Sequence, residues 1–225
     1  YPSASDEDYR NRTLLPYGAA WPRDENGPML PPAQAPYVFA LPGNHDWYDE
    51  LSWFTRFFCQ TWRYDTAADR RTDGLVAVPC PQDGPHTATT DWIGGWRTRQ
   101  SRSYFALKLP HDWWVLAVDT EFERELDVAQ KAYFVAVRQL ITSKDRVVLC
   151  AATPSWLEPG GRGYSNLRWF RDKILGPDVA VPLLLTGDTH HFAHYRSTTT
   201  DAVHERHYLT CGGGGAYLSG THWLS

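Results

Sequence analysis

Two apolar runs of this chain end in polar clusters, and each cluster lies directly behind a glycine. The first run is "YVFALPGNHD" at 37–46, and the second is "VPLLLTGDTHH" at 181–191. Short apolar runs that end in turn residues are typical of buried strands. Since a buried strand must be covered on both faces, these runs favour a layered α/β domain. In such domains, ligands bind at the carboxyl ends of the strands.

The remaining periodicity predicts strands and helices that alternate early in the chain and strands that pair locally later. Ser5 followed by Asp8 predicts the cap of a short first helix. The segment at 127–142 has helical spacing, with Val128, Ala132, Val135 and Ile141 among its apolar positions. Further helices are expected at 49–62 and 165–176, and further strands at 102–110, 112–120, 146–152, 190–197 and 203–211. The fold class is therefore α/β, with layered sheets covered by helices.

Length and composition limit the classes of protein to consider. A chain of 225 residues with 42% hydrophobic residues suits a single domain, 1–225, with a substantial core. The formal net charge of −4 argues against a nucleic-acid-binding surface. No apolar stretch approaches the roughly 20 residues that a membrane-spanning helix needs. The four cysteines are widely spaced, which argues against a zinc knuckle and suits a reducing compartment.

Each polar cluster also has a plainer interpretation. The segment "GNHD" is compatible with an Asx-type turn in which Asn44 and Asp46 bond to backbone groups. The segment "GDTHH" is compatible with a polar turn that carries two surface histidines. The occurrence of both clusters behind apolar strands favours one shared site instead. Its mixture of amide, carboxylate and imidazole groups suits Zn, Mn or Fe better than Ca or Mg.

Two smaller features are open to more than one interpretation. The glycine run at 212–215 favours a tight turn beneath a cleft, and the alternative is a backbone that approaches a phosphate group. Among the eleven tryptophans, Trp114 is expected in the core, whereas Trp47 fits either the core or the wall of a substrate site.

With these motifs, the chain resembles the calcineurin-like metallophosphoesterases. Their ordered motifs are D-x-H, G-D, G-N-H-[DE], a lone His and G-H-x-H. The segment "GNHD" at 43–46 matches the third motif fully, and "GDTH" at 187–190 matches the last with Asp188 in place of its first His. The segments at 99–120 and 186–218 further resemble a bacterial branch in which this domain often belongs to larger, membrane-associated proteins.

The resemblance implies a fold and a reaction. The fold would be the αββα four-layer sandwich of the metallo-dependent phosphatases, without its first strands. The reaction would be hydrolysis of a phosphomonoester or phosphodiester by a hydroxide held between two divalent cations, which are Mn, Fe or Zn. The substrate would be a phosphorylated small molecule or lipid-like compound, and no nucleic acid is expected as a partner.

The resemblance also assigns a role to individual residues. Asn44 would bind the second metal through its side-chain oxygen, and Asp188 would be a further ligand of that metal. His190 would bind the first metal. His45 would not be a ligand, because it would face the phosphate and protonate the leaving oxygen. Further candidates for a contact with metal or phosphate are His191 and Asp46.

Besides Asp188, two further departures from the family's pattern affect the site. Residues 1–42 contain neither D-x-H nor G-D, so we expect the chain to be a piece that begins behind those motifs and lacks part of the site by itself. The lone His, expected two places before Pro154, is replaced by Ala152. This replacement favours a competing hypothesis, a non-catalytic module that binds a ligand or partner through a degraded site. The retained "GNHD" and "GDTH" segments favour catalysis.

Overall fold

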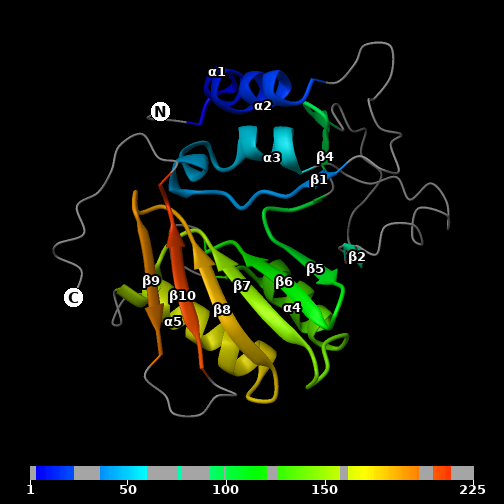
Figure 1. Ribbon diagram of the computed structural model, residues 1–225, viewed down its shortest axis with the longest axis vertical. Helices are drawn as coiled ribbons and strands as arrows, with labels where there is room; N and C mark the ends of the chain where they lie inside the picture. Colours follow the sequence, from blue (N-terminus) through cyan, green and yellow to red (C-terminus); the bar gives the residue numbers. More distant parts are fainter. Residues whose placement is uncertain are drawn as a thin grey trace. The chain divides into compact units, whose positions relative to one another are not determined.

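The computed structural model describes residues 4–22, 36–59, 76–77, 92–98, 100–120, 126–157, 162–197 and 205–213. The chain divides into two compact units, unit 1 at 1–103 and unit 2 at 104–225 (Figure 1). The single domain expected for the whole chain stays a prediction. Among the described residues, no helix has the length and apolar character that crossing a membrane requires.

Unit 2 is built on a mixed sheet of six strands in the order β5-β6-β7-β8-β10-β9. The four central strands run parallel, and each edge strand is antiparallel to its neighbour. This arrangement confirms the mixed α/β class. The strands are β5 (Phe105–Leu109), β6 (Trp113–Val118), β7 (Arg146–Ala151), β8 (Ala180–Thr186), β9 (Phe192–Arg196) and β10 (His207–Cys211).

The predicted hairpin joins β5 to β6, and its turn contains two residues in the left-handed region. His111 and Asp112 have φ angles of 61° and 60°. Positive φ at two successive turn residues matches the right-handed twist of paired strands. Trp114, on β6, is 1% exposed, which confirms its predicted place in the core. Burial raises the pKa of the Cys150 thiol on β7 to about 11.

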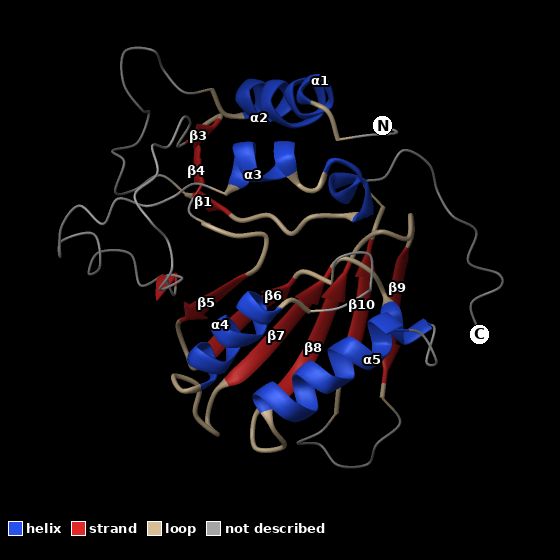
Figure 2. Ribbon diagram, turned by 180° about the vertical axis from the view of Figure 1, so that it is seen from behind, coloured by secondary structure: helices blue, strands red, loops and turns tan. Residues whose placement is uncertain are grey.

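Helices α4 and α5 both lie on one face of this sheet (Figure 2). Helix α4 (Val128–Arg138) begins behind Asp127, whose carboxylate accepts the backbone N–H of Gln130 at 2.6 Å. Helix α5 (Arg162–Trp169) continues as the π-helical turn η6 (Phe170–Leu175), and a short 3-10 turn, η5 (Ser155–Leu157), precedes it. As predicted, the helix ends at Gly176, which has a φ angle of 81°.

The face of α4 that packs on the sheet is not the one that its small apolar residues predict. Val128, Ala132 and Val135 are exposed, and Val128 is 82% exposed. Only Ile141, beyond the helix, is buried as expected. Aromatic rings bury more apolar area than valine or alanine, so the helix turns its aromatic face inward. The buried side chains of the helix are Gln130, Tyr133, Phe134 and Val137.

Unit 1 begins with one continuous helical stretch that consists of three parts. They are α1 (Asp6–Tyr9), the π-helical turn η1 (Arg10–Leu14) and α2 (Leu15–Ala20). The predicted cap is present. The backbone N–H of Asp8 donates to the Ser5 hydroxyl at 3.2 Å, and the Ser5 N–H donates to the Asp8 carboxylate at 3.3 Å.

The strand that leads to "GNHD" is shorter and less buried than the sequence predicts. Strand β1 contains only Tyr37–Val38, and residues 37–40 are all half-buried. It pairs in parallel with β4 (Trp96–Thr98), which pairs antiparallel with β3 (Trp92–Ile93). Because β4 has three residues, it limits how far β1 extends. The polar segment at 63–100 lies mostly outside the described residues, apart from 92–98, Gln100 and β2 (Val76–Ala77).

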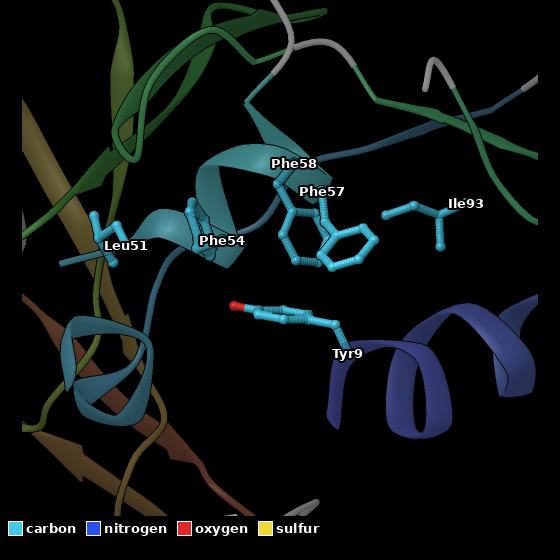
Figure 3. Close-up of a cluster of buried hydrophobic side chains, with 6 residues drawn as sticks. All are labelled: Tyr9, Leu51, Phe54, Phe57, Phe58 and Ile93. Atoms are coloured by element: carbon cyan, nitrogen blue, oxygen red, sulfur yellow. The ribbon is translucent and has the colours of Figure 1, made fainter. Parts of the chain in front are cut away.

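The core of unit 1 is a cluster of mainly aromatic side chains on α1 and α3 (Ser52–Phe58), which confirms the described part of the helix predicted at 49–62. Figure 3 shows the Tyr9 ring facing Phe57 and Phe58, and the ring centres lie 5.1 Å and 5.9 Å apart. Trp47 packs against the edge of this cluster. The first helix is therefore held to α3 through Tyr9. The buried members are Tyr9, Leu51, Phe54, Phe57, Phe58 and Ile93.

Candidate functional site

The "GNHD" turn of unit 1 is held in place by Asp46. The turn opens the 3-10 helix η3 (Asn44–Asp49), and Asp46 accepts the backbone N–H of Gly43 at 2.8 Å through Oδ2. Its other oxygen, Oδ1, accepts the hydroxyl of Tyr9. The predicted bond of Asp46 to a backbone group is present, but it runs back to residue 43, as in the cap of a helix, and not forward as in an Asx turn. Both carboxylate oxygens of Asp46 accept hydrogen bonds, and these bonds hold the turn that carries Asn44 and His45.

Burial raises the pKa of the Asp46 carboxyl group, and the hydrogen bonds from Tyr9 and Gly43 oppose that rise. Burial and the nearby Asp46 carboxylate raise the pKa of Tyr9, so its hydroxyl stays a donor. Asn44 and His45, the two other polar side chains of the motif, are half-buried. The imidazole of His45 meets the ring of Tyr48 edge-on at 4.9 Å. The turn therefore presents an amide and an imidazole beside an exposed aromatic ring.

Replacing Tyr9 with phenylalanine is expected to lower the free energy of unfolding by about 1–3 kcal/mol at neutral pH, because a buried carboxylate loses a donor. The pKa of Asp46, already raised by burial, would rise further. Because the substitution destabilises the charged form of Asp46, the loss in free energy of unfolding grows as pH increases through the pKa of Asp46. The loss should therefore be larger at pH 7 than at acid pH, where Asp46 is protonated. Urea denaturation at several pH values measures this difference.

The matched control is Tyr17→Phe on α2, since Tyr17 is 44% exposed. This change should alter the free energy of unfolding by less than about 0.5 kcal/mol. Equal losses for the two variants, or a loss at Tyr9 that is the same at every pH, would show that Tyr9 does not support the Asp46 carboxylate.

In unit 2, the segments that follow β7, β8 and β10 are joined by a series of backbone hydrogen bonds. The N–H of Gly187 donates to Ala152 O at 3.0 Å, and the N–H of Thr189 donates to Gly187 O at 2.8 Å. The N–H of His191 donates to Thr189 O at 2.7 Å, and the N–H of Gly212 donates to His191 O at 3.0 Å. Because β7, β8 and β10 are parallel, their carboxyl ends meet at one edge of the sheet, and these bonds fix the turns there.

The three candidate residues behind β8 differ in exposure. Asp188 is exposed and has a φ angle of 61°, a conformation that aspartate tolerates better than most residues. His190 is half-buried. His191 is 5% exposed, and neither of its ring nitrogens has a hydrogen-bond partner among the described residues. Ala152, at the position of the family's lone His, is half-buried and offers only its backbone carbonyl, to Gly187.

Gly212 lets the end of β10 approach the "GDTH" turn closely. A side chain at this position would overlap the backbone carbonyl of Thr189, whereas Gly213 has open space around it. The observation agrees with the predicted tight turn for this part of the glycine run. Residues 214 and 215 lie outside the described residues.

Sequence reasoning did not select Asp119, which follows β6 at the same edge of the sheet. Asp119 is 3% exposed, and the fully buried amide of Gln130 bonds to its backbone at both the N–H (2.9 Å) and the C=O (2.8 Å). A signal was available, because "WWVLAVDT" is an apolar run that ends in polar residues, like the two runs considered. Gln130 had no such signal, since it lies within a helix.

The structure thus places the predicted residues in two turns. Asp188, His190 and His191 belong to a single turn of unit 2, and residues 44–46 belong to a single turn of unit 1. Within the described ranges, no three His, Cys, Asp or Glu side chains form a cluster arranged to hold a cation. The donor types are an amide oxygen, a carboxylate and imidazoles.

Scans against protein-family models and searches of curated proteins and solved structures gave no match for the chain. The family resemblance therefore stays a prediction. The candidate site is supported by the chemistry of its residues and by the hydrogen bonds that hold the two turns.

Proposed function

We propose that this chain is a metal-dependent hydrolase of phosphate monoesters or diesters. In this proposal, Asn44, Asp188 and His190 bind divalent cations, and His45 protonates the leaving oxygen. The proposal includes the finer fold, the αββα sandwich of the metallo-dependent phosphatases, for which the six-stranded mixed sheet of unit 2 supplies one layer.

The observation that carries the proposal is the use of Asp46 within the "GNHD" turn. Its carboxylate bonds to Gly43 N–H and to the Tyr9 hydroxyl, so it is committed to holding the turn. Burial of a carboxylate is unfavourable unless hydrogen bonds compensate for it. The use of both Asp46 oxygens to hold one turn therefore indicates that the conformation of this turn is important for function. The groups that the turn offers are the amide of Asn44 and the imidazole of His45.

The donor set fits a transition-metal cation of the Zn, Mn or Fe type. Asn44 offers a carbonyl oxygen, Asp188 a carboxylate and His190 an imidazole nitrogen, a mixture that such cations accept. When bound, the cations neutralise negative charge on the phosphoryl group and make water a stronger nucleophile at neutral pH. Asp188 is an exposed residue that follows the buried end of β8.

The side chains of the chain itself then bind, orient and transfer a proton. His45 holds a proton for the leaving oxygen, and the edge-on Tyr48 ring restricts the rotation of its imidazole. The backbone bonds from Ala152 through Gly187 to Thr189 keep the "GDTH" turn rigid, which fixes the backbone of His190. Rigid support of this kind limits the ordering cost of binding.

Replacing His190 with alanine tests the metal-binding half of the proposal. We expect the full-length protein to hold divalent cations by elemental analysis and to hydrolyse a generic aryl phosphate. The His190→Ala variant should lose both, because a ligand that sits in a rigid turn cannot be replaced by a neighbour. The control is His194→Ala, since His194 is exposed on β9. Metal content equal to that of the wild type in the His190 variant would exclude His190 as a ligand.

A non-catalytic binding module is the second candidate function, and Ala152 favours it. The methyl group of Ala152 offers no lone pair where the family has an imidazole, so one metal would lack a ligand. The same experiment separates the two functions. Tightly held metal with turnover supports the hydrolase, whereas saturable binding of the aryl phosphate without turnover supports the module.

A further inference from the structure

Several buried polar side-chain atoms without hydrogen-bond partners occur in the segments that follow β7 and β8 of unit 2. Ser155 and His191 are each 5% exposed, and Trp156 and Thr189 are half-buried with their polar atoms fully covered. None of these atoms has a hydrogen-bond partner among the described residues. The atoms are Ser155 Oγ, Trp156 Nε1, Thr189 Oγ1, and Nδ1 and Nε2 of His191.

Sheet topology and one ring contact place these groups at the same edge of the sheet. Strand β8 lies between β7 and β10 (Figure 1). Trp156 follows β7, yet its ring centre lies 5.2 Å from that of Tyr208 on β10. Tyr208 is paired with Leu184, two residues before β8 ends, so residue 156 reaches over the last part of β8 to contact β10. His191 is fixed over the end of β10 by the backbone bond to Gly212.

Buried polar atoms in folded proteins nearly always have partners, so a local group of exceptions requires an explanation. Two buried threonines close to this edge do follow the rule. Thr186 and Thr210 are paired across β8 and β10. The Thr186 hydroxyl lies 3.3 Å from Leu209 O, to which it donates, and 3.5 Å from the Thr210 hydroxyl. The unpartnered atoms next to these satisfied threonines indicate a binding site for a polar group that the chain itself does not supply.

The chemistry of the four side chains selects the kind of ligand. The indole N–H of Trp156 is a donor only, so this atom cannot be a ligand of a metal ion. The hydroxyls of Ser155 and Thr189 and the imidazole of His191 can all donate as well. Four side chains that all donate hydrogen bonds suit a ligand with several acceptor oxygens. Negative charge on those oxygens strengthens the hydrogen bonds.

We propose that Ser155, Trp156, Thr189 and His191 form an oxyanion site that binds a phosphate group. The inference rests on the proposed function in one respect, the assignment of this phosphate to the ester substrate. The site itself requires no metal, because its contacts are hydrogen bonds. It would hold the phosphate of the substrate by residues outside the "GDTH" and "GNHD" motifs.

The test measures binding of inorganic phosphate to the full-length protein by calorimetry, with EDTA present to remove cations. The wild type should bind phosphate, and a non-hydrolysed aryl phosphate should compete with it if the source is an ester. His191→Ala should weaken the affinity by about tenfold or more, since a charge-assisted bond is lost. Trp156→Phe keeps the ring that contacts Tyr208 and removes only the N–H, so it should weaken binding by several-fold.

The control is His194→Ala, which removes an exposed imidazole three residues further along and should leave the affinity unchanged. Absence of phosphate binding in the wild type would overturn the proposal and assign the buried atoms to water. Wild-type affinity in both the His191 and the Trp156 variants would also overturn it. Phosphate binding under EDTA in a protein that never hydrolyses esters would support the oxyanion site and contradict the proposed function. Metal-dependent hydrolysis of esters by a protein that binds no phosphate under EDTA would support the proposed function and contradict the oxyanion site.

Discussion

Replacing His45 with alanine should lower the rate of aryl phosphate hydrolysis by about 10²–10⁴-fold, the usual contribution of a positioned general acid. The metal content should stay nearly unchanged, because His45 is assigned to the leaving oxygen and not to a cation. The turn that carries His45 should survive, since it is held by Asp46 through Gly43 and Tyr9. Steady-state kinetics combined with elemental analysis of the purified variant measures both quantities.

The leaving group gives a sharper version of this experiment. A leaving oxygen whose conjugate acid has a low pKa departs with little need for protonation. The decrease in hydrolysis rate caused by His45→Ala should therefore be smaller for esters with such leaving groups. His194→Ala serves as the imidazole control and should leave the rate unchanged. Undiminished hydrolysis in the His45 variant would exclude its assigned role. A loss of metal in parallel with activity would make His45 a ligand instead.

Replacing Phe134 with alanine should lower the free energy of unfolding by about 3–5 kcal/mol, because the change opens a cavity in the core. Phe134 is 1% exposed on α4. Its ring centre lies 4.9 Å from Phe170 and 5.0 Å from Tyr133, so it joins α4 to the turn η6. Arg138 makes a second link between the same elements, through a hydrogen bond of its Nε to Leu175 O at 2.6 Å. That bond cannot replace the lost packing.

Urea denaturation measures the Phe134 effect, and Phe192→Ala provides the matched control. Phe192 is 68% exposed on the edge strand β9, so its removal should change the free energy of unfolding by less than about 0.5 kcal/mol. A similar small loss for Phe134→Ala would show that the helix layer does not stabilise the sheet of unit 2. In that case the aromatic face of α4 would not be its packing face.

Several elements could be predicted because their signals are local. The apolar runs at 146–152 and 181–188 became β7 and β8, since a run of branched residues bounded by turns has few other stable states. The Ser5–Asp8 cap and the stop at Gly176 depend on bonds within a few residues, so they could also be predicted. The position of the "GDTH" turn followed from the end of β8, whereas β1 ends at Val38, well before "GNHD".

Other features depend on residues that are distant in sequence and could not be predicted. Gln130 is fully buried because its amide satisfies the backbone of Asp119, eleven residues earlier, and no local pattern signals that bond. Tyr9 bonds to Asp46 across 37 residues, so its contribution to the "GNHD" turn was not visible in the sequence. The short β1 was missed for the same reason, because the length of a strand also depends on its partner.

The sequence by itself determined the α/β class, the main strands of unit 2 and the chemical types of the candidate residues. These properties follow from periodicity and from side-chain chemistry, both of which are written into the order of residues. Only the tertiary structure decided which of the polar residues hold the turns and which have no hydrogen-bond partner among the described residues. The physical reason is that a buried polar atom must find a partner, and folding alone selects that partner. The Asp46 carboxylate has two hydrogen-bond partners, whereas the ring nitrogens of His191 have none among the described residues.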